Sequence, residues 1–253
     1  MSPPPASSFT FEPLFLALCV AAAALYALSA RRDPPEPWRA ALFALGFVLV
    51  AGALNSPLET IAVHYLLLIH LLQNVMIADW APPLLILGLT PAMQAAIARR
   101  GGSVLAWLTR PKIALPVWLI GWYGIHLAVF YDFALRNTWA LNIEHALLIA
   151  IGLLFWWPVL AETPQEVSVP VKIGYLGAAF VGSAFLGLGL TFSDAPFYDF
   201  YEAAPRLWGL SPSQDQNFGG ILMNAEQAAV FLAAILYFLL KLVPQDEHSS
   251  SEV

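Results

Sequence analysis

The sequence predicts an all-α fold, a polytopic bundle of about seven transmembrane helices. Of its 253 residues, 59% are hydrophobic and only 11% are charged, whereas a soluble domain carries about a quarter charged residues. Long apolar runs recur along the chain, and roughly 20 such residues suffice for a helix to cross the hydrocarbon core. These observations predict a single transmembrane domain over residues 1–253.

Seven apolar runs have the length of membrane spans, and charged residues or prolines close most of them. The expected spans are residues 11–30, 38–54, 59–80, 113–131, 141–160, 171–192 and 219–243. Leu84–Leu89 is apolar but too short to cross alone, so it is either a kinked continuation of the third span or an interfacial helix. Residues 193–218 are expected to form an outer aromatic and acidic loop, and residues 244–253 a polar cytoplasmic tail.

The basic residues predict how these spans are oriented. Only Arg136 and Arg206 fall on one side of a seven-span chain. The side richer in Lys and Arg is cytoplasmic, which predicts an N-terminus outside and a C-terminus in the cytoplasm. The nine basic residues on that richer side are Arg31, Arg32, Arg39, Arg99, Arg100, Arg110, Lys112, Lys172 and Lys241.

Composition and motifs argue against several classes of function. The single cysteine, Cys19, allows no internal disulfide. The formal charge of −6 and the lack of a basic cluster exclude nucleic acid as an expected partner. No phosphate-binding loop or hydrolytic motif is present. We therefore expect a protein that is not an enzyme and whose surroundings are membrane lipids.

Three histidines are predicted to share one level near the outer surface. His64, His126 and His145 lie at similar depths below the outer ends of three different spans. An ionisable residue inside a span is costly, so each is a candidate functional residue. Hydrogen bonding between helices is the alternative role for any single histidine. As a group at one depth, they point to a metal or cofactor site.

Further polar residues surround this level and are expected to support it. His70 lies deeper on the third span, with Gln73 and Asn74 on the same helix face. Histidine with methionine sulfur suits copper, whereas imidazole alone also suits zinc or haem iron. The other candidates are Glu144 beside His145, Met223 and Glu226 in the seventh span, and Asp215 in the outer loop.

Several segments between the third and the seventh span share a further resemblance. They are residues 70–88 (HLLQNVMIADWAPPLLILG), His126, residues 142–145 (NIEH), 155–160 (FWWPVL), 192–194 (FSD), 198–201 (YDFY), 205–210 (PRLWGL), and Asp215-Gln216 to Met223. Together they resemble the membrane-embedded cytochrome c oxidase (caa3-type) assembly factors of the CtaG family, over roughly Asn55 to the end of the seventh span. The sequence departs from the family at Asn74, where members usually have histidine, and at residues 223–227, where a more apolar stretch is usual.

This resemblance implies a multi-pass protein of the bacterial plasma membrane that handles copper on the outer side for cytochrome c oxidase subunits. His64, His126 and His145 would then be copper ligands and Met223 a soft ligand, with Glu144 and Glu226 orienting imidazoles or neutralising the ion. A haem-binding electron carrier, a transporter and a metal-free structural partner of the oxidase remain alternatives.

Overall fold

The computed structural model describes residues 3–242, and the predicted all-α fold is confirmed within that range, which contains helices and no strand. Six helical segments there are long and apolar enough to cross a membrane, and a bent pair makes a seventh. The helices are α1 (Pro13–Ala30), α2 (Pro37–Leu54), α3 (Pro57–His64), α4 (Leu67–Val75), α5 (Ala81–Gly88), α6 (Pro91–Leu108), α7 (Pro111–Ile125), α8 (Ala128–Arg136), α9 (Thr138–Leu160), α10 (Val169–Phe192), α11 (Asp199–Ala203) and α12 (Pro212–Leu242).

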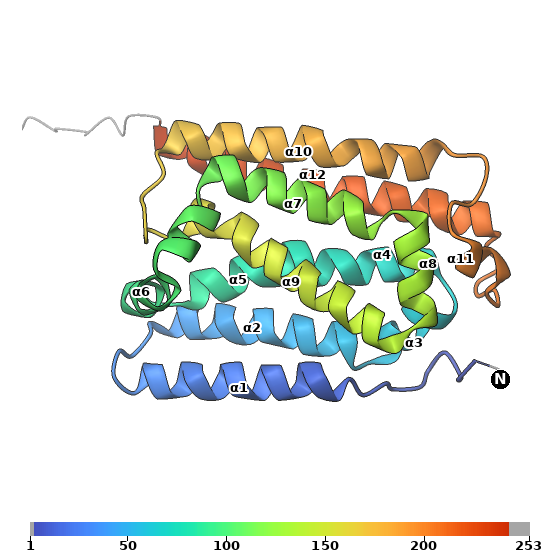
Figure 1. The fold of residues 1–253 in the computed structure, drawn as a ribbon, viewed down its shortest axis with the longest axis horizontal. Helices are drawn as coiled ribbons and strands as arrows, with labels where there is room; N and C mark the ends of the chain where they lie inside the picture. Colours follow the sequence, from blue (N-terminus) through green and yellow to red (C-terminus); the bar gives the residue numbers. More distant parts are fainter. Residues whose placement is uncertain (1–2, 243–253) are drawn as a thin grey trace, which may run out of the picture.

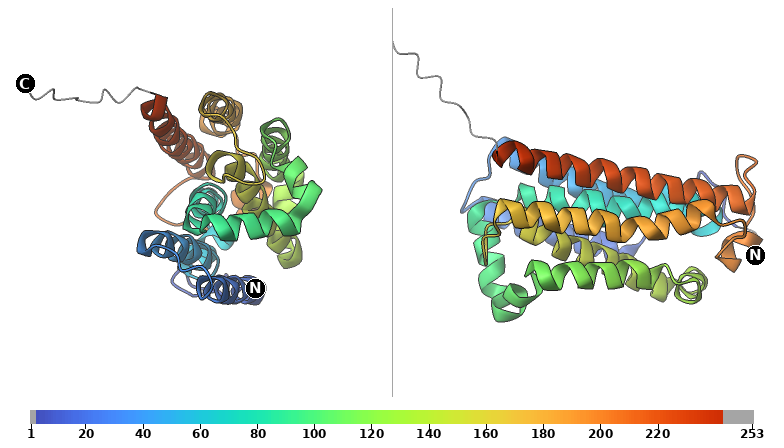
Figure 2. Two further views of the ribbon diagram at one scale, coloured as in Figure 1. Left: turned by 90° about the vertical axis from the view of Figure 1, so that its left-hand side faces the viewer. Right: turned by 90° about the horizontal axis from the view of Figure 1, so that it is seen from above.

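The long helices run side by side, so the bundle has two ends (Figure 1). The short helices α3, α8 and α11 gather at one end, which we call the histidine end. Helix α6 lies across the other end (Figure 2). All nine basic residues that the sequence assigns to one side belong to helix termini, loops or α6 at this second end, which we call the basic end.

The expected helix over residues 59–80 differs from the structure. Helix α3 ends at His64, the chain is extended at Leu66, and α4 begins at Leu67. A π-helical turn, Met76–Trp80, then leads directly into α5. The continuous apolar segment is therefore Leu67–Gly88. Leu84–Leu89 lies mostly within α5 and continues this segment.

Two other expected boundaries also differ. Helix α7 ends at Ile125, and the chain turns into α8 instead of continuing to residue 131. The outer loop of residues 193–218 contains α11, and its last residues already belong to α12, which begins at Pro212. The expected tail of residues 244–253 lies outside the described residues, as does residue 243 of the seventh expected span.

Close helix contacts depend on glycine at two crossings. A Cβ on Gly152 of α9 would lie 2.2 Å from the carbonyl oxygen of Ala78 in the π-helical turn. A Cβ on Gly220 of α12 would lie 2.6 Å from the carbonyl oxygen of Gly187 in α10. Small residues allow such approaches between helices in lipid. The close contact at Gly152 places α9, the helix that carries Glu144 and His145, against the third span.

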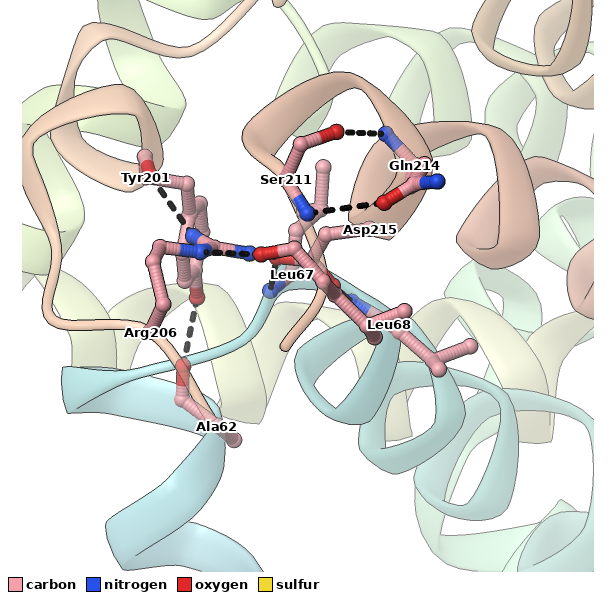
Figure 3. Close-up of polar contacts among 9 residues, drawn as sticks. Ala62, Leu67, Leu68, Tyr201, Arg206, Ser211, Gln214 and Asp215 are labelled. Carbon is pink, nitrogen blue, oxygen red and sulfur yellow. Dashed lines mark hydrogen bonds and ion pairs between the residues drawn. The ribbon is translucent and has the colours of Figure 1, made fainter. Parts of the chain in front are cut away.

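The start of α4 is held by a distant carboxylate, shown in Figure 3. Asp215 is fully buried, and its two oxygens accept hydrogen bonds from the backbone N–H of Leu67 at 3.0 Å and of Leu68 at 2.9 Å. Arg206 donates to the same carboxylate at 2.8 Å and to the carbonyl oxygen of Tyr201 at 3.0 Å. A negative charge at a helix N-terminus is also favoured by the helix dipole. This interaction ties the outer loop to the first turn of α4.

We expect Asp215→Ala to lower the free energy of unfolding by about 3 kcal/mol, because it leaves two backbone N–H groups and the Arg206 guanidinium without their partner. The measurement is thermal unfolding of the purified protein in detergent. Asp194→Ala removes an exposed carboxylate from the same loop and serves as the matched control. Equal unfolding midpoints for the two variants would show that Asp215 does not anchor α4.

Candidate histidine site

Six polar side chains from five segments meet at the histidine end, and we call them the histidine cluster. All six are at most 5% exposed. His126 follows the last turn of α7, and the short helices α8 and α11 contribute one tyrosine each. The cluster consists of His70 (α4), His126, Tyr131 (α8), Glu144 and His145 (α9) and Tyr201 (α11).

His70 lies at the centre of this cluster. Its ring centroid is 5.0 Å from that of Tyr131 and 6.0 Å from that of His145. The Nε2 atom of His70 lies 3.9 Å from Oε1 of Glu144. Tyr131 also faces His126, at a centroid distance of 5.7 Å. The Tyr131 ring therefore packs against both His70 and His126.

Hydrogen bonds determine which ring nitrogen carries the proton in two of the histidines. The Tyr201 hydroxyl donates its only proton to the carbonyl oxygen of Ala62 at 2.6 Å, so it accepts from Nδ1 of His70 at 2.7 Å. Nδ1 of His126 donates to the carbonyl oxygen of Trp122, also at 2.7 Å. In the neutral ring both Nε2 atoms therefore keep a free lone pair.

Several polar atoms of the cluster have no hydrogen-bond partner within the described residues. They are Nε2 of His70, Nε2 of His126, both ring nitrogens of His145, the Tyr131 hydroxyl and Oε1 of Glu144. A buried polar group without a partner costs about 1–3 kcal/mol. Histidines that bind metal also donate their other N–H to a carbonyl or similar group, which is the arrangement found for His70 and His126.

The cluster does not form a closed metal site. Within residues 3–242, no three histidine, cysteine, aspartate or glutamate side chains converge closely enough to hold a metal ion. The donors that come together are His70, with Nε2 3.9 Å from the Glu144 carboxylate, and His145, with its ring centroid 6.0 Å from that of His70. These donors fit copper by type, since imidazole is a copper ligand, and they provide an incomplete ligand set.

Two of the residues expected to bind metal lie elsewhere. His64 ends α3 and lines a surface pocket of about 530 Å³ together with Arg136 and Phe200. Met223 is fully buried on α12, between Gly219, which faces Leu71, and Glu226. The structure thus brings together His70, His126 and His145, whereas His64 lies at a surface pocket.

The expected supporting residues divide into two groups. Gln73 is buried and donates to the carbonyl oxygen of Ala53 at 2.8 Å and to the Glu59 carboxylate. Asn74 is fully buried, and neither of its side-chain polar atoms has a partner within the described residues. Both follow His70 on α4, so they lie beside the cluster.

Glu226 belongs to a second polar group, next to the π-helical turn. Its carboxylate accepts from the indole N–H of Trp80, while its neighbour Gln227 donates to Asp79 at 3.3 Å. Trp80 is ten residues beyond His70 on the same span, about 15 Å along a helix. Glu226 therefore does not support the histidine cluster.

Sequence reasoning did not select Glu59, Tyr131 or Tyr201. In the sequence, Glu59 has the position of an ordinary acidic residue in the first helical turn after the Ser56 cap. Tyr201 stands in an aromatic outer loop, 131 residues from its partner His70. The only sequence signal for Tyr201 was the YDFY segment of the family resemblance.

Tyr201→Phe is expected to lower the free energy of unfolding by about 1–3 kcal/mol, because the substitution leaves the buried Nδ1–H of His70 without its acceptor. Thermal unfolding in detergent measures the change. Tyr237→Phe removes a hydroxyl from a half-exposed side chain of α12 and provides the control. If both variants unfold at the wild-type temperature, the hydroxyl does not hold the imidazole.

Comparison with known proteins assigns the chain to a family. Over 120 residues it is 27% identical to two uncharacterized proteins, Mb0105 of Mycobacterium bovis and MT0111 of Mycobacterium tuberculosis. The matched region is 46% of this chain but 18% of each relative, so the chain spans about a fifth of their length. No solved structure matches. The model of the cytochrome c oxidase caa3 assembly factor family matches residues 21–245, and this chain therefore belongs to that family.

Proposed function

We propose that this protein handles copper during the maturation of a caa3-type cytochrome c oxidase, at the outer face of a bacterial plasma membrane. Membership of the assembly-factor family supports the association with an oxidase. Copper is the cargo in this proposal, bound by side chains and passed on, and the protein carries out no catalysis of its own.

The basic end supports the orientation that the proposal requires. Nine of the eleven Lys and Arg residues belong to it, and the side richer in these residues faces the cytoplasm. The histidine end then faces outward, with the N-terminus outside and the C-terminus inside. In this orientation the buried histidine cluster lies near the outer side, so copper from that side reaches it without crossing the bilayer.

The single observation that carries the proposal is the set of free ring nitrogens on His70 and His145, buried beside Glu144. A carboxylate next to two imidazoles can balance the charge of a bound cation. An incomplete ligand set also leaves positions that a ligand from the receiving oxidase subunit can occupy. Such openness suits a protein that must release its metal, whereas a closed four-ligand site retains it.

His70→Ala/His145→Ala is expected to lose the copper that the wild-type protein binds, because both free imidazoles beside Glu144 are removed. Detergent-purified protein is loaded with Cu(I) in the presence of a mild chelator, and copper per chain is measured by mass spectrometry. His64→Ala, outside the cluster, is the matched control and should retain copper. Elution in size-exclusion chromatography identifies any variant that has not folded.

Other outcomes would change the assignment. Loss of copper from His64→Ala, with retention in the double variant, would move the site to the surface pocket. Absence of copper from the wild-type protein would favour the metal-free structural partner, which acts by protein contacts alone. A Soret band in the purified protein would favour a haem-binding carrier.

A further inference from the structure

A second site lies at the opposite end of the bundle, where α6 crosses the end of α1. A pocket of about 560 Å³ opens there. Its walls come from two separate parts of the chain, the end of α1 with the following loop and the first ten residues of α6. The lining residues are Ser29, Arg32, Asp33, Ala92, Met93, Ala96, Arg99 and Arg100.

The charge of this pocket is strongly positive. Arg32, Arg99 and Arg100 are exposed, and within the described residues none of them forms an ion pair or donates a side-chain hydrogen bond. The single acidic residue of the pocket, Asp33, accepts a hydrogen bond from the Thr90 hydroxyl. Three guanidinium groups against one carboxylate leave a net charge of about +2. Unpaired guanidinium groups around one pocket are suited to a phosphate, because a guanidinium can donate two parallel hydrogen bonds to phosphate oxygens.

A hydrogen bond between distant segments holds the two pocket walls together. It runs from Thr90 to Asp33 and joins the start of α6 to the loop after α1. Next to the pocket, Arg39 donates to the carbonyl oxygens of Leu87 at 3.0 Å and Leu89 at 2.8 Å, which holds the start of α2 against the end of α5. The arginines of α6 and of the loop after α1 therefore line one pocket whose walls are joined.

Exposed tryptophans indicate the level of this pocket in the membrane. Trp38 at the start of α2 and Trp107 at the end of α6 are 47% and 50% exposed. Tryptophan is enriched where the hydrocarbon meets the lipid headgroups. Helix α6 lies across the bundle at the same end (Figure 2), and its Ala92, Met93 and Ala96 give the pocket an apolar part. The pocket thus combines an apolar portion with cationic groups at headgroup depth.

We propose that this pocket binds the phosphate headgroup of an anionic phospholipid, held by Arg32, Arg99 and Arg100. Basic pockets between membrane helices on the cytoplasmic side bind such headgroups. The chemistry recognised is a phosphate diester next to an acyl chain, which distinguishes a lipid from a free phosphate ion. This site lies at the opposite end from the histidine cluster and does not depend on copper binding.

Arg99→Ala/Arg100→Ala is expected to weaken binding of phosphatidylglycerol roughly 30-fold, since two cationic groups near the headgroup are lost. The full chain, purified in a neutral detergent, is titrated with phosphatidylglycerol and separately with phosphatidylcholine. Bound lipid is counted by native mass spectrometry. The wild-type protein should retain phosphatidylglycerol preferentially, and Arg32→Ala, on the opposite wall, should weaken the same binding.

The matched control is Arg110→Ala/Lys112→Ala, which removes two positive charges from the same end but outside the pocket. It should bind phosphatidylglycerol like the wild-type protein. If phosphatidylglycerol binding falls equally in the control, the lipid is attracted by net charge in general, and the proposed site is wrong. Equal binding of phosphatidylcholine, or displacement of the lipid by inorganic phosphate at comparable concentration, would also overturn it.

Discussion

The buried carboxylate of Asp215 is the interaction on which the histidine end depends. Inside a membrane, backbone N–H groups that lose their helical partners find no water to replace them. The interruption between α3 and α4 creates such groups at Leu67 and Leu68, and Asp215 accepts from both. Its partner Arg206 reaches the backbone of Tyr201, whose hydroxyl in turn contacts His70. One carboxylate therefore links the helix start, the outer loop and the central imidazole.

The sequence predicted the fold class and the two ends of the bundle because both depend on composition. Long apolar runs mark the helices that face lipid, and the positions of the eleven basic residues along the sequence divide them into nine on one side and two on the other. The break at Tyr65 and Leu66 could not be predicted in the same way. Neither residue is a proline or glycine, and the carboxylate that caps the helix after the break lies almost 150 positions away.

The candidate site was predicted only in part, and the break explains the difference. Counting turns along one continuous third helix placed His64 at the level of His126 and His145 and His70 below them. With a separate α3, His64 moves to the surface pocket, while His70 lies in the first turns of α4 beside His145. His145 needed no such correction, because α9 begins at Thr138, three residues before the expected start. His126 lies just beyond the end of α7 instead of inside a helix that continues to residue 131, and its ring packs against Tyr131 of the cluster.

The long separation between the partners of the cluster also has a consequence for biosynthesis. His70 is synthesised early, but Tyr201 follows 131 residues later and Asp215 follows Leu67 by 148. A chain still emerging from the ribosome can insert its first spans, yet it has neither the cap for α4 nor the acceptor for the His70 ring. The imidazoles therefore reach their final arrangement only after Asp215, in the first turn of the last span, has been made, so a chain that ends before this residue lacks the assembled cluster.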